Sequence, residues 1–153
     1  MRYQTALAIL ILTPAIAIPA GAYSADEKAP NPDTIAALES KIEQAPPREQ
    51  CYLYAELIHQ MTEFSLRQYS AGDVQKGNAL LQRVQLLAHK LHLSFGGGND
   101  KRLKNAEILL RHTAFRLNEM LHASDYETRP LLEETLAQVN QADNEAMMQV
   151  FKK

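Results

Sequence analysis

Four long segments of this chain carry apolar residues at the three- and four-residue spacing of an amphipathic helix. They run from about Pro47 to Ser70, from Asp73 to about Phe95, from Asp100 to about His122, and from Ser124 nearly to Lys153. In each segment the apolar positions form one stripe at about 100° per residue, which is the pattern of a helix with one buried face. No segment has the alternating, β-branched character of a strand. The sequence therefore predicts an all-α fold.

Glycine-containing turns separate the first three segments. Ala71-Gly72 follows the first segment, and the run Gly96-Gly97-Gly98 ends the second. Each turn leads to an aspartate, Asp73 or Asp100, whose side chain can accept a hydrogen bond from an early backbone N–H of the next helix. Short loops between helices of similar length predict an antiparallel up-down four-helix bundle.

The start of the last helix has two alternatives. Ser124 and Glu127 match the S-x-x-E capping box. Thr128 precedes Pro130 by two residues, and proline is tolerated in the first turn of a helix. The helix therefore begins either at the capping box or at Thr128.

An additional short N-terminal helix is predicted ahead of the bundle. Asn31 can cap it, and Pro32 then occupies the first helical position, where its missing N–H costs nothing. Ile35, Leu38 and Ile42 follow at helical spacing. Pro46-Pro47 ends the helix because proline cannot continue it.

The first two dozen residues have the features of a secretory signal peptide. Arg2 precedes an apolar run at residues 6–12, and small residues follow at 20–22. The run is shorter than the roughly 20 residues of a transmembrane helix, so we expect cleavage after Ala22 or after Ser24, with an uncleaved anchor as the alternative. Residues 1–22 are then the signal peptide, residues 23–31 a flexible linker, and residues 32–153 one helical domain in the periplasm or outside the cell.

Charge and cysteine content narrow the possible functions. The chain has 16 basic and 18 acidic residues, and because clustered Lys and Arg supply much of the affinity for phosphate backbones, no nucleic-acid partner is expected. Cys51 is the only cysteine, so an intramolecular disulfide is excluded. Because Cys51 adjoins an apolar stripe, we expect a buried thiol, with an intermolecular disulfide as the alternative.

Two E-x-x-H pairs, Glu56 with His59 and Glu119 with His122, raise the question of a metal centre. Carboxylate-bridged di-iron bundles use two such pairs together with one Glu from each of the other two helices. In both helices the pair points away from the apolar stripe, and the segment 73–95 contains no glutamate. We therefore expect solvent-exposed pairs and no metal.

Other signals of a cofactor or of catalysis are weaker. His89 and His92 lie one turn apart, but no cysteine or carboxylate stands beside them in sequence. Met61 and Met120 stand at core spacing, and the chain has no C-x-x-C-H haem motif. The glycine run lacks the G-K-[ST] ending of a phosphate-binding loop. No cofactor and no catalytic residue is predicted.

The segment 100–122 is rich in basic residues, which spread around its polar side. They are Lys101, Arg102, Lys104, Arg111 and Arg116. A solvated helix face is the interpretation that this spread favours.

Asp143 interrupts the apolar stripe of the last helix. That stripe consists of Leu132, Leu136, Val139, Ala146, Met147 and Val150. Counting a rise of about 1.5 Å per residue from the loops places Asp143 at the height of Tyr54 and Ala106. Because a lone buried carboxylate is costly without a hydrogen bond, we predict a buried Tyr54–Asp143 pair. The alternative is that the helix rotates or frays and exposes Asp143.

The sequence as a whole favours an exported helical bundle that acts by binding, with a protein partner or a second copy of itself. A metal- or haem-binding bundle is one alternative, and an enzyme of unknown class is another. No stable insertion into a membrane is expected after cleavage, because the chain has no further long apolar stretch.

Secretion is expected to remove the first 22 or 24 residues, because the apolar run is short and ends in small residues. The intact mass of the exported protein measures this directly. Recovery of the full-length chain in the membrane fraction would contradict the prediction.

Overall fold

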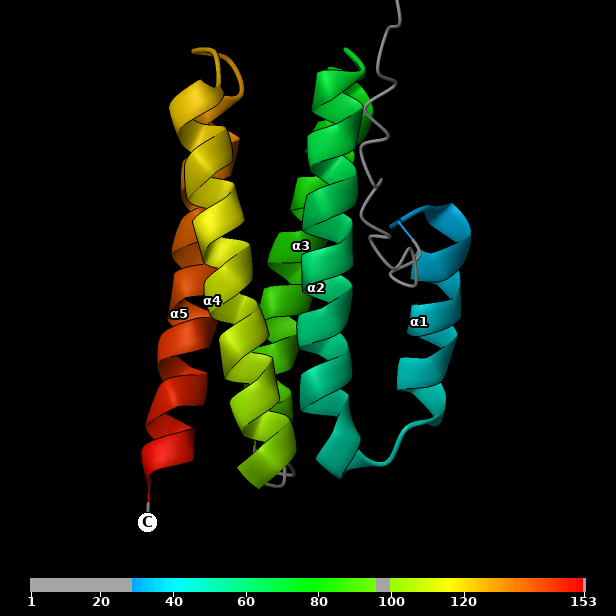
Figure 1. Ribbon diagram of the computed structural model, residues 1–153, viewed down its shortest axis with the longest axis vertical. Coiled ribbons are helices and arrows are strands. Elements are labelled where there is room, and N and C mark those ends of the chain that lie inside the picture. The colour runs from blue at the N-terminus through cyan, green and yellow to red at the C-terminus, as the bar shows by residue number, and fades with distance from the viewer. Residues whose placement is uncertain (1–28, 96–99, 153) are drawn as a thin grey trace, which may run out of the picture.

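The computed structural model describes residues 29–95 and 100–152, which form five helices and no strand (Figure 1). The helices are α1 (Pro32–Gln44), α2 (Pro47–Ser70), α3 (Val74–Ser94), α4 (Asp100–Ala123) and α5 (Arg129–Phe151). The all-α prediction is confirmed, and the helices begin and end close to the glycine and proline breaks expected from the sequence. None of the described helices is both long enough and apolar enough to cross a bilayer.

Two of the predicted helix caps are confirmed. The Asn31 side chain accepts a hydrogen bond from the Thr34 backbone N–H at 2.9 Å, and the Asn31 N–H donates to Thr34 Oγ1 at 2.9 Å. Asp73 Oδ1 accepts from the Lys76 N–H at 3.1 Å. The side chain of Asp100, the third predicted cap, lies outside the described residues.

The capping box predicted at Ser124 and Glu127 is wrong, and the alternative start at Thr128 is confirmed. Ser124 Oγ donates to the Leu121 carbonyl at 2.8 Å, so this hydroxyl closes α4 instead of opening α5. Asp125 Oδ1 accepts from the Thr128 N–H at 2.9 Å. The turn between the helices is thus held by a side chain that the S-x-x-E pattern does not contain.

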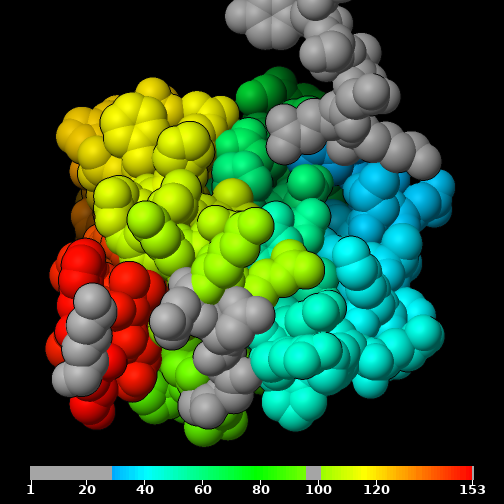
Figure 2. Space-filling view, turned by 60° about the horizontal axis from the view of Figure 1, so that its bottom comes forward, coloured from blue at the N-terminus to red at the C-terminus, as the bar shows by residue number. Residues whose placement is uncertain are grey.

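The four long helices form two hairpins, α2–α3 and α4–α5, that lie side by side (Figure 1). α2 packs on α4, α3 packs on α5, and α1 packs on α2. Contacts between the hairpins join residues at similar distances from the helix starts, as in Glu63–Arg116 and Gln85–Thr135. α2 and α4 therefore run parallel to each other, and so do α3 and α5. Figure 2 turns toward the reader the end at which α4 begins and α5 ends.

This order differs from that of a simple up-down bundle, in which helices adjacent in sequence are also adjacent around the axis. There α3 would neighbour α4, and α2 would neighbour α5. Neither pair is among the main packing pairs of the described residues. Successive helices alternate in direction, as expected, but the second hairpin lies beside the first so that like-directed helices meet.

The apolar core fills the space between the hairpins. Its largest fully buried apolar side chains are Leu57, Ile58, Met61, Leu81, Leu91, Leu110, Leu117 and Leu132. α2 buries more than one stripe, including Leu53 and Ala55, because it packs against α1, α3 and α4. In α5 the buried stripe includes Thr135 and Ala142, whereas Met147, predicted to be in the core, is exposed.

Tyr69 fastens the α2–α3 hairpin near its turn. Its hydroxyl donates to Asn78 Oδ1 at 2.5 Å, and its ring lies over Gly77, where an added Cβ would come within 2.8 Å of the ring. Burial, and to a lesser degree the charge of Asp125, raises the pKa of Tyr69 to about 12. The turn itself passes through Gly72, whose φ of 82° is a left-handed conformation that glycine adopts without strain.

Gly77→Ala is expected to destabilise the fold by about 1–3 kcal/mol, because the methyl group would overlap the Tyr69 ring. Urea denaturation measures the change. In a Tyr69→Ala background the same substitution should instead stabilise by up to about 1 kcal/mol, since alanine is the better helix former. Equal effects in the two backgrounds would show that the ring does not require glycine at this position.

Candidate functional site

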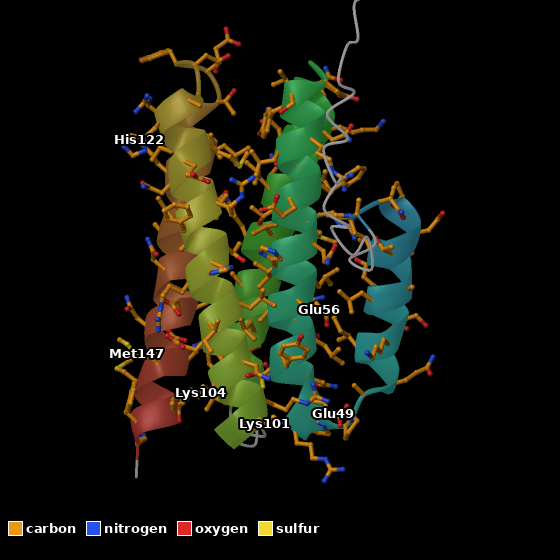
Figure 3. All side chains as sticks on the ribbon, in the orientation of Figure 1. Glu49, Glu56, Lys101, Lys104, His122 and Met147 are labelled. Atoms are coloured by element: carbon orange, nitrogen blue, oxygen red, sulfur yellow. The ribbon has the colours of Figure 1, made fainter. Side chains whose placement is uncertain are left out.

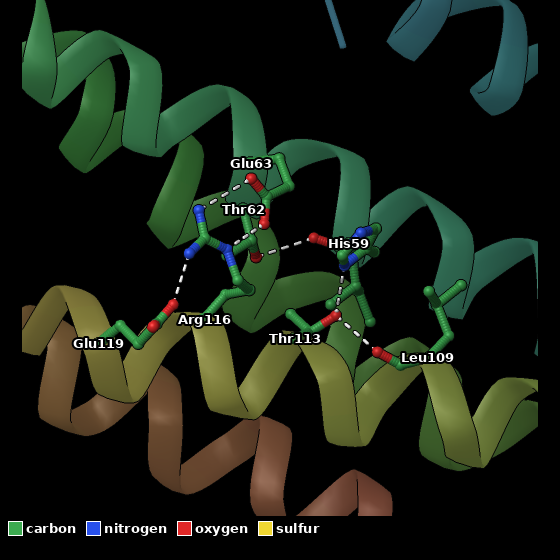
Figure 4. Close-up of polar contacts among 8 residues, drawn as sticks. His59, Thr62, Glu63, Leu109, Thr113, Arg116 and Glu119 are labelled. Carbon is green, nitrogen blue, oxygen red and sulfur yellow. Dashed lines mark hydrogen bonds and ion pairs between the residues drawn. The ribbon is translucent and has the colours of Figure 1, made fainter. Parts of the chain in front are cut away.

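Polar side chains line the seam between α2 and α4 (Figure 4). His59 Nδ1 lies 3.0 Å from Thr113 Oγ1, and the same hydroxyl donates to the Leu109 carbonyl at 2.8 Å. Because threonine has a single hydroxyl proton, His59 Nδ1 has to be the donor in this contact. The network thus selects the form of His59 that carries a proton on Nδ1.

Arg116 joins two glutamates in the same seam. Its Nε donates to Glu63 Oε1 at 2.7 Å, its Nη2 donates to Glu63 Oε2 at 3.4 Å, and its Nη1 pairs with Glu119 Oε2 (Figure 4). The hydrogen bonds from Glu63 and then Glu119 raise the pKa of Arg116 above its ordinary value. Both carboxylates are engaged by the guanidinium, so the cluster ties α4 to α2 and resembles a clamp more than a catalytic centre.

The two E-x-x-H pairs have different environments. Glu119 and His122 are exposed, as predicted, and His122 Nδ1 contacts the Asn118 carbonyl at 2.7 Å. The expectation that His59 faces solvent is wrong: it is half-buried against α4, because α4 covers a second face of α2. Among the described residues, no three His, Cys, Asp or Glu side chains lie where they could hold a metal ion together.

The predicted hydrogen bond between Tyr54 and Asp143 does not form in the structure. Asp143 Oδ1 is buried and has no hydrogen-bond partner. The reason is the helix order, because α2 and α5 do not pack as neighbours and equal height no longer brings the two residues together. Burial raises the pKa of Asp143, and the charge of Arg111 on α4 partly offsets that rise.

Cys51 is completely buried, which confirms the expectation drawn from the stripe of α2. Burial also raises the pKa of the thiol above its ordinary value. A thiolate is the reactive form of cysteine. An intermolecular disulfide at Cys51 would therefore require local opening of α2 before the sulfur could meet a partner.

A groove of about 510 Å³ follows the other seam, between α3 and α5. Ala88 and Ala142, which are 4% and 2% exposed, lie at its base. Its other lining residues are Gln85, Leu86, His89, His92, Gln138, Gln141 and Glu145. Small side chains below and long polar side chains beside them leave an open channel along the outside of the bundle.

Some of these polar side chains are already engaged. Gln85 Nε2 donates to Thr135 Oγ1 at 3.0 Å, and Glu145 accepts from Gln141 Nε2 at 3.1 Å and also contacts His92 Nδ1. Within the described part of the chain, no hydrogen bond involves the side chains of His89 or Gln138. The groove therefore offers donors and acceptors to a ligand or partner.

Two leucines lie along the exposed side of α3 next to this groove. Leu86 is 66% exposed and Leu93 is 74% exposed. They are seven residues apart, so they lie on one face of the helix. The sequence analysis did not select them, although both fall outside the apolar stripe of their segment, and large apolar residues on a polar face were the available signal.

A second hollow of about 480 Å³ lies beside the α2–α4 seam and is lined in part by His59, Glu63 and Arg116. The side chains of this seam bond mainly to one another, whereas the α3–α5 groove has unbonded polar groups and exposed leucines. Comparison of the chain with protein-family models, with curated proteins and with solved structures finds no match.

Asp143→Asn is expected to stabilise the fold at neutral pH by up to about 1 kcal/mol, because it removes a buried carboxylate charge without a partner. A carboxyl whose folded-state pKa is raised contributes stability that is fully present below its unfolded pKa of about 3.9. That contribution is lost as the pH rises through the raised value. The advantage of the variant should therefore shrink as the pH falls toward 4.

Urea denaturation at neutral and acidic pH measures the difference, and Glu134→Gln, at an exposed carboxylate of the same helix, is the control. A destabilised Asp143→Asn variant at neutral pH would show that the carboxylate has a favourable partner in solution.

Proposed function

We propose that this chain is an exported helical-bundle protein that acts by binding a protein partner, in the periplasm or outside the cell. The binding face is the α3–α5 groove together with Leu86 and Leu93. The observation that carries the proposal is the pair of leucines, 66% and 74% exposed, beside a groove with unbonded polar side chains. Covering such leucines releases about 25 cal/mol for each Å² of apolar surface removed from water, which is a driving force for association.

The proposal includes the domain plan expected from the sequence. Residues 1–22 or 1–24 act as the signal peptide, the residues up to 31 form a linker, and residues 32–153 form one domain. That domain is a four-helix bundle of alternating helix direction, with α1 alongside α2. The packing pairs of the described helices and the early proline breaks support this plan.

The shape and chemistry of the groove favour a polypeptide over a small molecule. The groove is open along its length, and the alanines at its base leave room for a side chain from a partner. The amide groups of Gln138 and Gln141 can donate to and accept from a backbone or a polar side chain. Apolar anchors beside polar groups that can be satisfied are the usual composition of protein interfaces.

A photo-crosslinking amino acid at Gln141 tests the assignment in cells that export the chain. We expect a single adduct with one other protein. Asn140, which is exposed on α5 but does not line the groove, is the control position and should give no adduct. The double variant Leu86→Ser/Leu93→Ser should lower the yield at Gln141 by more than about tenfold, since central apolar anchors each contribute more than about 1 kcal/mol.

Each other result counts against the proposal. An adduct of twice the chain mass would assign the groove to self-association instead of a separate partner. Equal yields at Gln141 and Asn140 would mean random encounter. Absence of any adduct at Gln141, with normal export of the variant, would remove the groove as a binding face.

A further inference from the structure

The structure divides the basic residues of α4 between two sides of the helix. Arg116 is bound by Glu63 and Glu119, and the Arg102 guanidinium lies 5.2 Å from the centre of the Tyr52 ring, so both face α2. Lys104 and Arg111 are seven residues apart on the side of α4 that faces α5 and solvent, and both are exposed. The solvated face expected from the sequence is therefore two surfaces, one occupied by contacts to α2 and one open.

Exposed apolar side chains accompany the open cations. Ile108 and Phe115 lie four residues beyond Lys104 and Arg111 respectively, on the same face of α4. Phe115 is 61% exposed, and from α5 come Met147 and Phe151, which are 39% and 77% exposed. Figure 3 shows Lys104 and Met147 at the same end of the molecule, where α4 begins and α5 ends.

The interaction of Arg111 with Asp143 shows that the two sets lie on one side of the molecule. The charge of Arg111 acts on Asp143, so these two residues face each other across the α4–α5 interface. Met147 and Phe151 follow Asp143 by one and two helical turns on the same side of α5. We refer to Lys104, Ile108, Arg111, Phe115, Met147 and Phe151 as the α4–α5 outer face.

The carboxylates nearest to this face are withdrawn from it. The Glu107 side chain is only 8% exposed and is paired with Arg111. Asp143 is half-buried, with Oδ1 inside the protein. The ammonium group of Lys104 and the exposed part of Arg111 therefore dominate the local charge, although the chain as a whole carries a formal net charge of −2.

We propose that the α4–α5 outer face binds the surface of an anionic lipid bilayer, independently of the α3–α5 groove. Phe115, Phe151 and Met147 would enter the headgroup region, while Lys104 and Arg111 pair with lipid phosphates. Cations beside protruding aromatic and aliphatic side chains on adjacent helices are the composition of interfacial helices that lie on anionic membranes. A lipid surface accepts side chains at any spacing, which suits this pattern better than an acidic protein partner would.

A tryptophan at position 115 reports on this contact, since the chain contains no tryptophan. We expect the emission of Phe115→Trp to shift to shorter wavelength with vesicles that contain phosphatidylglycerol. It should stay unchanged with vesicles of phosphatidylcholine alone, and high salt should reverse the shift. Leu93→Trp, at an exposed leucine of α3, is the matched reporter and should not respond.

Charge reversal tests the electrostatic part of the contact. Lys101→Glu/Lys104→Glu in the Phe115→Trp chain should weaken vesicle binding by more than about tenfold, because each lysine near an anionic surface contributes about one e-fold or more to affinity. Lys41→Glu/Lys90→Glu changes the net charge by the same amount on α1 and α3 and should leave binding unchanged. Far-ultraviolet circular dichroism checks that all variants are folded.

Several results would overturn the proposal. One is a shift of equal size with phosphatidylcholine vesicles, or an equal response from Leu93→Trp, either of which would indicate attachment through another part of the chain. Another is equal loss of binding in both charge-reversal pairs. A shift produced by polyglutamate but not by vesicles would assign the α4–α5 outer face to an acidic protein.

Discussion

The parallel packing of α2 on α4 and of α3 on α5 is the constraint on which the rest of the structure depends. It places α2 between three other helices, which buries Cys51 and turns His59 toward Thr113. It also brings the polar contacts between hairpins into two seams, one closed by Arg116 and its glutamates and the other left open as a groove. The interior between the seams is apolar, so burial of the core stabilises the pairing while the seams fix its register.

The sequence was sufficient for the helices and insufficient for their neighbours. Helix ends follow from local chemistry, such as the Asn31 and Asp73 caps and the proline pair at 46–47, and these are readable from a few adjacent residues. An apolar stripe, in contrast, states that a face is buried but not which helix covers it. The errors at His59 and at the Tyr54–Asp143 pair both arise from that gap, because each assumed a neighbour that the hairpin arrangement replaced.

The candidate surfaces were harder to predict than the fold because they consist of departures from the pattern. Leu86 and Phe115 are apolar residues on polar faces, and periodicity treats them as noise until the neighbouring helices are placed. The basic residues of α4 illustrate the same difficulty, since their even spread around the helix concealed a division into paired and open cations. Only the position of α2 separates the two groups.

The two kinds of contact also differ greatly in how far apart their residues are along the chain. Tyr69 reaches Asn78 across nine residues, whereas His59 and Thr113 are 54 residues apart and Gln85 and Thr135 are 50 apart. Closing a long stretch of chain costs more conformational entropy than closing a short one, and non-local contacts therefore tend to form late. We expect each hairpin to assemble rapidly by itself and the seams to form in a second, slower event. The α3–α5 groove, which exists only after that event, is then a mark of the completely folded chain.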